Sequence, residues 1–302
     1  MKYAIITGGW SKEKSENIDG AEDVYNSLIL KNEVRKFIFD DSYDREQNFK
    51  IISQIKIFNP DLVFLCTTEE LPIQGVLEFL DIKYTGSNIL TTSLSLDKEK
   101  CKLLFDFNYI KTPPGLTVSR DILIKNSINF SSLIFPVVVK PNSSGSSCGV
   151  SFVKNHQELL TGLEKAFAFD SKVLIEKFIS GREITVPMLD EKLLAVVEVV
   201  KNNEILDYVS KADYKRFIQY KKAELTTEVM SKIEIIMSKL KHIFCIKNIF
   251  RADFILTKDD KLILLEINTL PFLGDEVMGV SARAINWTYE EFLEQVAMSA
   301  LI

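Results

Sequence analysis

Apolar runs alternate with amphipathic stretches over the first third of the chain. Runs typical of buried strands lie at 3–9, 34–40 and 61–66, and stretches with helical spacing lie at 21–31 and about 46–58. Alternation of strand and helix at this spacing predicts a parallel sheet covered by helices. The segment YTGS at 84–87 lies near the end of this pattern, and we expect a Rossmann-like N-terminal domain over 1–92.

The pattern changes after residue 92, where strands begin to outnumber helices. We expect helices at about 97–108, 156–168, about 227–243 and 288–300. The expected strands lie at 135–140, 149–153, 172–179, 183–189, 192–200, 205–210, 249–256 and 261–267. We interpret the polar stretch 211–224 as a mobile loop. The whole predicts a small α+β domain over 93–180 and a strand-rich C-terminal domain over 181–302, so the fold class combines α/β and α+β units.

Composition and charge narrow the range of functions. The 302 residues carry a net charge of −5, whereas nucleic-acid binders are usually basic, so we expect no nucleic-acid partner. Only two histidines are present, which argues against a His-rich zinc site or a Ser-His-Asp triad. The four cysteines lie far apart without a CxxC pair, a pattern typical of buried thiols in a reducing compartment. With no signal peptide and no apolar stretch near the roughly 18 residues of a membrane helix, we expect a cytoplasmic protein without a membrane partner.

The most specific chemical signal is a pair of apolar runs near the C-terminus, IFRADFIL and KLILLEIN. A symmetric hairpin that closes on Asp259-Asp260 places Asp253 opposite Glu266. It also places Arg251 opposite Asn268, and strand alternation puts all four side chains on one face. Facing carboxylates repel each other, and a divalent cation that also binds nucleotide phosphates relieves this repulsion. We therefore predict a magnesium site, with Arg251 placed to stabilise developing charge. The alternative is a solvated polar face.

Two lysines and a loop form a candidate phosphate site. Lys140 ends the apolar run FPVVVK, and a charge at the end of a buried strand often faces a ligand. The loop NSSGSSCG at 142–149 follows, and its N–H groups and hydroxyls can fold over phosphates, although it is not a Walker A loop. Lys98 lies at the start of a predicted helix. Taken alone, these features are also typical of a hairpin turn and a solvated lysine.

Three further segments carry weaker signals. Glu176 begins the segment EKFI, which ends a strand and can offer backbone groups to an adenine ring. Glu183 follows Gly181 by two residues and can bind a ribose hydroxyl. Lys211 opens the polar stretch. For each of these residues the alternative is a solvated surface charge.

Seven segments, taken in order, resemble the ATP-grasp superfamily, and most closely the D-alanine–D-alanine ligase family. The segments are GGWSKE (8–13), QGVLEFLDIKYTGS (74–87), SLSLDKEKCKLLF (93–105), FPVVVKPNSSGSSCGVS (135–151), VLIEKFISGREITV (173–186), RADFIL (251–256) and LLEINTLP (264–271). They extend over almost the whole chain. The resemblance implies an ATP-grasp fold with ATP held between the central and C-terminal domains. It also implies a ligase of peptidoglycan or peptide biosynthesis that joins a carboxylate to an amine through an acyl phosphate.

The resemblance also implies roles for individual residues. The implied nucleotide-binding residues are Lys98, Lys140, Ser146, Ser147, Glu176, Lys177, Phe178, Ile179, Glu183, Lys211, Leu265 and Asn268. The implied ligands of two Mg²⁺ ions, which Mn²⁺ can replace, are Asp253, Glu266 and Asn268. The residues implied in catalysis are Arg251, Ser146, Glu13 and Lys211, with Glu13 receiving the ammonium group of the first amino acid. The substrates would be small and amino-acid-like, and the enzyme a homodimer.

Several positions depart from the family pattern in the amino-acid half of the site. They are the short segment 66–70 in place of a His-Gly loop, Ala212 in place of a tyrosine, Phe272 in place of a glycine, and Val277-Met278 in place of a Ser-Leu pair. Two alternatives follow: a ligase with another amino acid, hydroxy acid or amine as acceptor, or an ATP-binding regulator without ligase activity. A Rossmann oxidoreductase is disfavoured because GGWSKE does not match GxGxxG.

Overall fold

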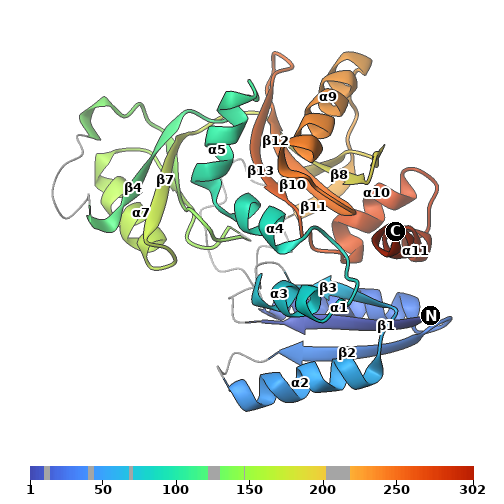
Figure 1. The fold of residues 1–302 in the computed structure, drawn as a ribbon. Coiled ribbons are helices and arrows are strands. Elements are labelled where there is room, and N and C mark those ends of the chain that lie inside the picture. The colour runs from blue at the N-terminus through green and yellow to red at the C-terminus, as the bar shows by residue number, and fades with distance from the viewer. Residues whose placement is uncertain (10–13, 40–43, 68–70, 122–129, 146, 202–217) are drawn as a thin grey trace.

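Three β-sheets with flanking helices make up the structure, a computed structural model (Figure 1). It describes residues 1–9, 14–39, 44–67, 71–121, 130–145, 147–201 and 218–302. Each sheet falls within one of the three ranges that the sequence predicts as domains. The division into domains at those boundaries stays a prediction. None of the helices in the described ranges is long and apolar enough to cross a membrane.

The N-terminal sheet is parallel, as the strand–helix alternation predicts, with the order β2-β1-β3. Its strands are β1 (Lys2–Gly8), β2 (Glu33–Phe39) and β3 (Leu62–Cys66). The helices of this unit are α1 (Lys14–Leu28), α2 (Arg45–Phe58) and α3 (Leu71–Phe79). One face of the sheet packs on α1 and the C-terminal helix α11 (Tyr289–Leu301), and the other packs on α2 and α3. Burial on both faces explains why β1 and β3 are largely apolar, whereas β2, at the edge of the sheet, carries charged and exposed positions.

The central sheet is antiparallel, with the order β4-β7-β5-β6. Its strands are β4 (Gly115–Ser119), β5 (Val137–Pro141), β6 (Ser151–Val153) and β7 (Lys172–Lys177). Helix α7 (His156–Phe167) covers one face and forms a small apolar core with it. The helices α4 (Ile89–Leu96) and α5 (Lys98–Phe107) lie before this sheet in the chain, and the short η1 (Phe130–Ser132) follows β4. Figure 1 shows α4 and α5 between the central sheet and the other two sheets.

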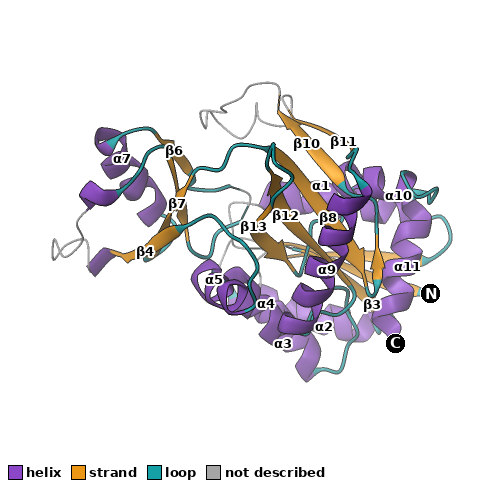
Figure 2. Ribbon diagram, turned by 90° about the horizontal axis from the view of Figure 1, so that it is seen from above, coloured by secondary structure: helices purple, strands orange, loops and turns teal. Residues whose placement is uncertain are grey.

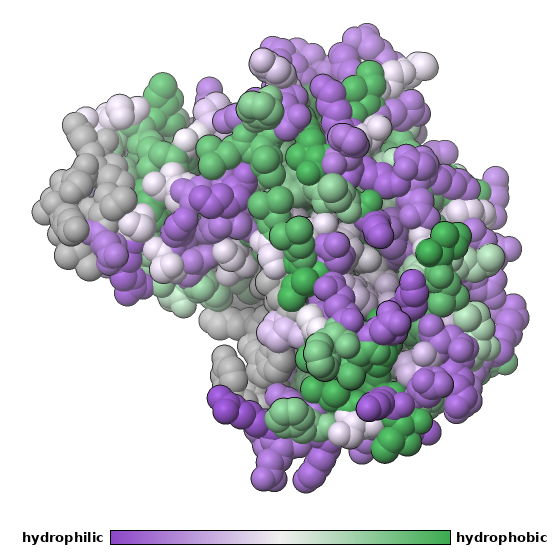
Figure 3. Space-filling view, in the orientation of Figure 1, coloured by the Kyte–Doolittle hydropathy of each residue, from purple (hydrophilic) through white to green (hydrophobic). Residues whose placement is uncertain are grey.

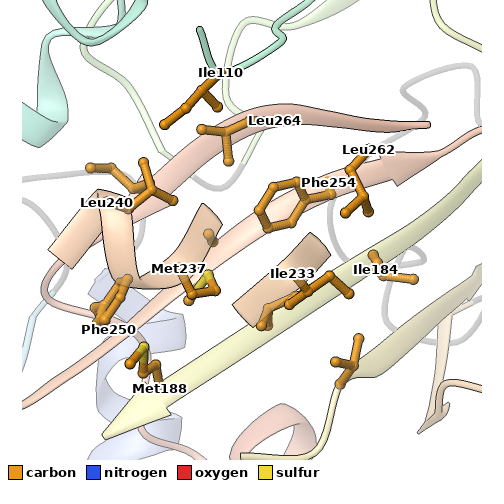
Figure 4. Packing of buried hydrophobic residues seen from close by; sticks show 14 of the residues in the cluster. Ile110, Ile184, Met188, Ile233, Met237, Leu240, Phe250, Phe254, Leu262 and Leu264 are labelled. Atoms are coloured by element: carbon orange, nitrogen blue, oxygen red, sulfur yellow. The ribbon is translucent and has the colours of Figure 1, made fainter. Parts of the chain in front are cut away.

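The C-terminal sheet has the order β11-β10-β8-β12-β13, with β9 paired to β8. Its strands are β8 (Arg182–Leu189), β9 (Lys192–Leu193), β10 (Val197–Lys201), β11 (Ile218–Lys222), β12 (Ile249–Leu256) and β13 (Leu262–Asn268). Helix α9 (Thr227–Phe244) buries an apolar stripe against one face (Figure 4). The other face carries the polar side chains described below. The chain ends with η3 (Asp275–Gly279), α10 (Val280–Arg283) and α11, which returns to the N-terminal sheet (Figure 2).

The structure corrects three expectations. The stretch 211–224, predicted as a mobile loop, contains β11, which pairs with β10 along its length. The single strand expected at 192–200 is two strands, β9 and β10, and the strand expected at 205–210 lies outside the described residues. Cysteine burial is also only partly as expected. Burial raises the pKa of both Cys66 and Cys101 to about 12, but Cys245 is exposed at the end of α9, where its left-handed backbone ends the helix.

A buried asparagine joins the N-terminal and C-terminal units. The Asn248 side chain accepts from the Gly86 N–H at 2.8 Å and donates to Val296 O at 2.8 Å and Ser299 Oγ at 2.9 Å. Its backbone is left-handed, with φ of 60°, a conformation that asparagine tolerates better than most residues. One side chain therefore fixes the connection between α3 and α4 and the last helix to the start of β12.

We expect Asn248→Ala to lower the free energy of unfolding by about 3 kcal/mol, because buried hydrogen-bonding groups lose their partner. The matched control is Asn286→Ala, at an exposed position that is also left-handed, with φ of 63°. This control should lower the free energy of unfolding by roughly 1 kcal/mol, because alanine is less favourable than asparagine in the left-handed conformation. Urea unfolding of both variants measures the difference. Equal losses would mean that the Asn248 hydrogen bonds contribute nothing.

Candidate nucleotide and metal site

Two acidic side chains face each other across the β12–β13 hairpin. The register pairs Asp253 with Glu266 and Arg251 with Asn268, which confirms the predicted pairs. Alternation is also as predicted, since Arg251 and Asp253 are partly exposed while Ala252 is fully buried against α9. The four polar side chains therefore lie on the sheet face that α9 leaves uncovered.

The hairpin is not symmetric, although the prediction assumed that it was. The register shifts after Asp253, where Phe254 pairs with Leu264 rather than with Leu265. Leu265 is thus the extra residue of a β-bulge, and the pairs between the bulge and the turn differ from the symmetric ones. The bulge leaves both Leu265 and Glu266 partly exposed, which places an apolar side chain beside the acidic pair.

The surroundings of the two carboxylates differ. Thr185 Oγ donates to Asp253 Oδ1 at 2.5 Å, Asn268 Nδ2 donates to Asp253 Oδ2 at 3.1 Å, and Arg251 Nε lies 3.6 Å from Asp253 Oδ1. Burial raises the pKa of Asp253 despite Arg251, and the charge of Glu266 raises it further. Burial also acts against ionisation of Glu266, but Lys98, Lys140 and Arg251 outweigh it and lower the pKa of that carboxyl.

Helix α5 brings one of the predicted lysines to this pair. Asp97 caps the helix by accepting from the Lys100 N–H at 3.0 Å, and Asn142 after β5 accepts from the Glu99 N–H at 2.8 Å. These bonds fix the start of α5 beside the end of β5. Lys98 Nζ then lies 3.6 Å from Glu266 Oε2 and donates to the Ser144 carbonyl at 2.8 Å.

A buried glutamate on β7 is held between two lysines. Lys140 Nζ lies 2.6 Å from Glu176 Oε2, and Lys102 Nζ lies 2.5 Å from Glu176 Oε1. Only 4% of the Glu176 side chain is exposed, so burial opposes its charge, but Lys140 and Lys102 lower its pKa nonetheless. Burial likewise opposes the charge of Lys140, and Glu176 and Glu266 raise its pKa. Glu176 and Lys140 are therefore ionised near neutral pH.

Two of the backbone N–H groups after Glu176 already donate hydrogen bonds within the protein. The Lys177 N–H donates to Pro114 O at 2.8 Å and the Phe178 N–H donates to Pro136 O at 3.1 Å. Within the described part of the chain, the Ile179 N–H makes no such backbone bond. Of the N–H groups of Lys177, Phe178 and Ile179, that of Ile179 can therefore donate to a ligand. Glu183 is partly exposed on β8, and its negative charge contributes to the raised pKa of Asp253.

Three predicted site residues lie outside the described residues: Glu13, Ser146 and Lys211. Ala212, one of the departures from the family pattern, also lies outside them. Ser147 is described and is exposed in a turn, with φ of 58°. The Cys148 N–H donates to Gly145 O at 3.0 Å across the same turn. The described residue Ser144 of the segment 142–149 is close to Lys98.

Five of the predicted residues line one small cavity between the central and C-terminal sheets: Lys98, Lys140, Glu176, Leu265 and Glu266. Its lining also includes Lys102. Lysines and glutamates that line one cavity, with the apolar side chain of Leu265, form a site that suits a polyphosphate with an attached planar base.

Two residues of this site were not predicted from the sequence. Lys102 lies one helical turn after Lys98 on α5, so the i, i+4 spacing is a signal that was available. Thr185 contacts Asp253 because β8 pairs with β12, and the sequence does not reveal that pairing.

The residues present fit a divalent cation. Among the described residues, no group of three or more His, Cys, Asp or Glu side chains gathers into a metal site. The donor set is instead two carboxylates, of Asp253 and Glu266, and the amide of Asn268 across the hairpin. A hard oxygen donor set with few protein ligands is typical of Mg²⁺ bound together with nucleotide phosphates. Burial and the charge of Glu266 raise the pKa of Asp253, which means that they disfavour its ionised form. A bound cation would stabilise that ionised form.

Three of the positions that depart from the family pattern lie in the segment after β13: Phe272, Val277 and Met278. Val277 and Met278 are buried in η3, with 5% and 0% exposure, so their side chains pack in the interior. Phe272 lies against two glycines: a Cβ on Gly20 or on Gly274 would come within 2.2 Å or 2.3 Å of its ring atoms. Only glycine therefore leaves room for this ring between α1 and the segment before η3.

Comparisons with known proteins agree with this geometry. A family model described as "D-ala D-ala ligase C-terminus" matches residues 108–297. A D-alanine–D-alanine ligase of Buchnera aphidicola subsp. Schizaphis graminum is 31% identical over 312 residues, which covers 98% of this chain and 97% of the relative. One of Clostridium beijerinckii is 31% identical and covers 100% of this chain and 99% of the relative. The structure of D-alanine–D-alanine ligase from Bacillus anthracis complexed with ATP has a TM-score of 0.81 and 27% identity, and covers 100% of this chain and 97% of that one. The predicted ATP-grasp fold is confirmed.

Proposed function

Because the chain belongs to the D-alanine–D-alanine ligase family, we propose that it joins two D-alanine molecules in an ATP-dependent reaction that releases ADP and phosphate. The observation that supports this most is the pairing of Asp253 with Glu266 beside Lys98, at a cavity that Lys140 also lines. This arrangement has the charges and donors that a metal-bound triphosphate requires. An ATP-dependent ligase also needs a compartment that supplies ATP, which favours the cytoplasm.

We assign the nucleotide to the cavity between the central and C-terminal sheets. The adenine lies near Ile179 and Leu265, with the Ile179 N–H as a hydrogen-bond donor and Leu265 as an apolar surface. Glu176 accepts from the exocyclic amine, and Glu183 binds the ribose. Lys98 and Lys140 bind phosphate oxygens, and the loop that carries Ser146 and Ser147 covers them. Lys211 assists at the phosphates.

We assign Mg²⁺ to Asp253, Glu266 and Asn268, and its charge would reduce the repulsion between the phosphate oxygens and the incoming carboxylate. The chain's own contribution is to fix these ligands. Thr185 and Asn268 hold the Asp253 carboxylate through hydrogen bonds to its two oxygens. Lys98 holds Glu266 ionised from the opposite side.

The reaction then depends on positioning and charge. The carboxylate of the first D-alanine, whose ammonium group pairs with Glu13, attacks the γ-phosphate in line. The bond from the γ-phosphorus to the bridging oxygen breaks, ADP leaves, and an acyl phosphate is formed. The amine of the second D-alanine attacks the acyl carbon, and phosphate leaves. Arg251, beside the acidic pair, stabilises the negative charge that develops in both steps. We assign to the segments 142–149 and 211–217 the shielding of the acyl phosphate from water.

The acceptor is the part of the reaction for which the structure favours a second candidate. Val277, at the position where the family has a serine, is buried and apolar, so it offers no hydroxyl to an acceptor carboxylate. The bulky Phe272 stands where the family has a glycine. A ligase that takes D-alanine as donor and another amino acid, hydroxy acid or amine as acceptor is therefore the second candidate.

Phosphate release measured with purified protein, ATP and Mg²⁺ tests both candidates, with mass spectrometry of the products. We expect D-alanine alone to give release of phosphate and a product of the dipeptide mass. Release that requires D-alanine together with a second compound identifies the second candidate. ATP binding without release in any combination of D- and L-amino acids, hydroxy acids and amines would contradict both, and would indicate a regulator.

We further propose that the protein is a homodimer in which α3, α4 and α5 form the contact. Large apolar side chains on these helices are exposed, and Figure 3 shows apolar surface over α3 and α4. They are Phe79 (89% exposed), Leu90 (74%), Leu103 (60%) and Phe107 (82%). The three helices adjoin one another in Figures 1 and 2, and we assign these side chains to one contact. An apolar region of this kind is typical of an interface.

We expect the double substitution Leu103→Glu and Phe107→Glu to convert the dimer to a monomer, because charges cannot be buried in an apolar contact. Size-exclusion chromatography with light scattering measures the mass. The control is Leu160→Glu with Ile235→Glu, at exposed apolar positions on α7 and α9. A dimer that survives the first pair of substitutions would place the interface elsewhere, and a wild-type monomer would refute the dimer itself.

A further inference from the structure

Lys102 makes two short polar contacts that none of the roles above requires. Its Nζ lies 2.5 Å from Glu176 Oε1 and donates to the Pro113 carbonyl at 2.5 Å. The side chain is 20% exposed and lines the same cavity as Lys98, Lys140 and Leu265. It therefore lies at the nucleotide site rather than on the outer surface of α5.

The contacts of Lys102 leave it little capacity to bind a ligand itself. An ammonium group has three N–H donors, and two of them are directed at Glu176 and Pro113. A lysine meant for phosphate would be better placed beside Glu266, where Lys98 already lies. The geometry of Lys102 is thus that of a residue that acts on Glu176.

The other neighbours of Glu176 show what Lys102 adds. Lys140 on β5 holds Oε2 at 2.6 Å, and on the β4 side the neighbour is Gly115, which has no side chain. A Cβ on Gly115 would come within 3.0 Å of Glu176 Cγ, so β4 fits closely against the glutamate. Of the described residues, only Lys102 and Lys140 form ion pairs with this carboxylate. Without Lys102, only Lys140 would orient it.

We propose that Lys102 is a positioning residue, which fixes the Glu176 carboxylate so that Oε1 can accept a hydrogen bond from the exocyclic amine of adenine. The inference rests on the proposed function, because it takes ATP as the nucleotide. Each carboxylate oxygen has two lone pairs, so Oε1 can accept from Lys102 and from the amine at once. Lys102 also ties Glu176 to Pro113 at the end of the α5–β4 connection, and so sets the distance between the base and the phosphate-binding Lys98 one turn away on α5.

A binding cycle with two ligands and two proteins tests this role. The ligands are ATP and purine riboside triphosphate, which lacks the exocyclic amine, and the proteins are the wild type and Lys102→Met. We expect the wild type to bind ATP about tenfold more tightly than the analogue, as one hydrogen bond to a charged acceptor predicts. In Lys102→Met this preference should fall below about threefold, with kcat unchanged at saturating ATP. Isothermal titration calorimetry measures affinity, and steady-state kinetics separates KM from kcat.

The controls separate positioning from folding. Lys100→Met, at an exposed position of α5, should keep the full preference for ATP. Lys102→Gln is a second neutral variant that keeps an N–H donor for Pro113, and thermal unfolding selects whichever Lys102 variant is folded. If both are unfolded, Lys102 is a structural contact only and the proposal is wrong.

The outcomes also separate this inference from the proposed function. A Lys102 variant that weakens both nucleotides equally, or keeps the tenfold preference, overturns the role of Lys102 but leaves the ligase intact. A wild type that binds neither nucleotide overturns the proposed function instead.

Discussion

Glu266→Gln is expected to lower kcat/KM by on the order of 1,000-fold, because the substitution removes one of the two charges that hold the cation. Glu266 is ionised at the site although it is partly removed from water, since Lys98, Lys140 and Arg251 lower its pKa. A neutral amide would leave Asp253 as the sole carboxylate of the pair. Rates measured over a wide range of Mg²⁺ concentration should therefore show a large rise in the Mg²⁺ needed for half-maximal rate.

The matched control is Glu234→Gln, which makes the same chemical change at an exposed position of α9 on the far side of the sheet. Its kinetics should be those of the wild type. If Glu266→Gln also had wild-type kinetics at low Mg²⁺, the assignment of the cation to the β12–β13 hairpin would be wrong. Unfolding curves of the two variants establish that any loss of rate is not a loss of fold.

Arg251→Ala should lower kcat by about 100- to 1,000-fold, the loss typical of removing one donor to a developing oxyanion. Affinity for ATP should change by less than about threefold, because Arg251 is assigned to the transferred groups and not to the nucleotide. Arg251 lies 3.6 Å from Asp253 and opposite Asn268, so it faces the same end of the site as the cation. Single-turnover rates with bound ATP measure the chemical step directly.

Two other substitutions sharpen the interpretation of Arg251. Arg251→Lys keeps the charge but lacks the planar fork, and we expect it to restore only part of the rate. Arg182→Ala removes an arginine from β8 that pairs with Glu198 and lies outside the candidate site, and its rate should be normal. A wild-type rate for Arg251→Ala would remove this residue from the mechanism.

The parts of the fold that were predictable are those with strong local patterns. The continuous apolar runs of β1 and β3 and the regular stripe of α9 were found within a few residues of their ends. Helix α3 was not predicted, because it has nine residues and contains Pro72 and Gly75, which obscure helical spacing. Strand β11 was not predicted because its polar sequence, IQYKK, follows from its place at the edge of the sheet and not from burial.

Some features of the candidate site could also be predicted from local patterns, and others could not. Asp253 and Glu266 could be paired from the sequence because they share one hairpin, and local spacing fixes a hairpin's register. The bulge at Leu265 could not be predicted, since no residue in the sequences of the two strands indicates its position. The contact of Thr185 with Asp253 joins segments 68 residues apart, which no local pattern encodes. The spacing of Lys102 from Lys98 was visible in the sequence, but its contact with Glu176, 74 residues away, was not.

The central claim is that the acidic pair of the β12–β13 hairpin holds the cation of bound ATP. Anomalous diffraction from crystals with Mn²⁺ and a non-hydrolysable ATP analogue tests it most directly. We predict an anomalous peak between the carboxylates of Asp253 and Glu266, in contact with phosphate oxygens of the nucleotide. Nucleotide bound with no peak between these two side chains, or with the metal held by other residues, would contradict the claim.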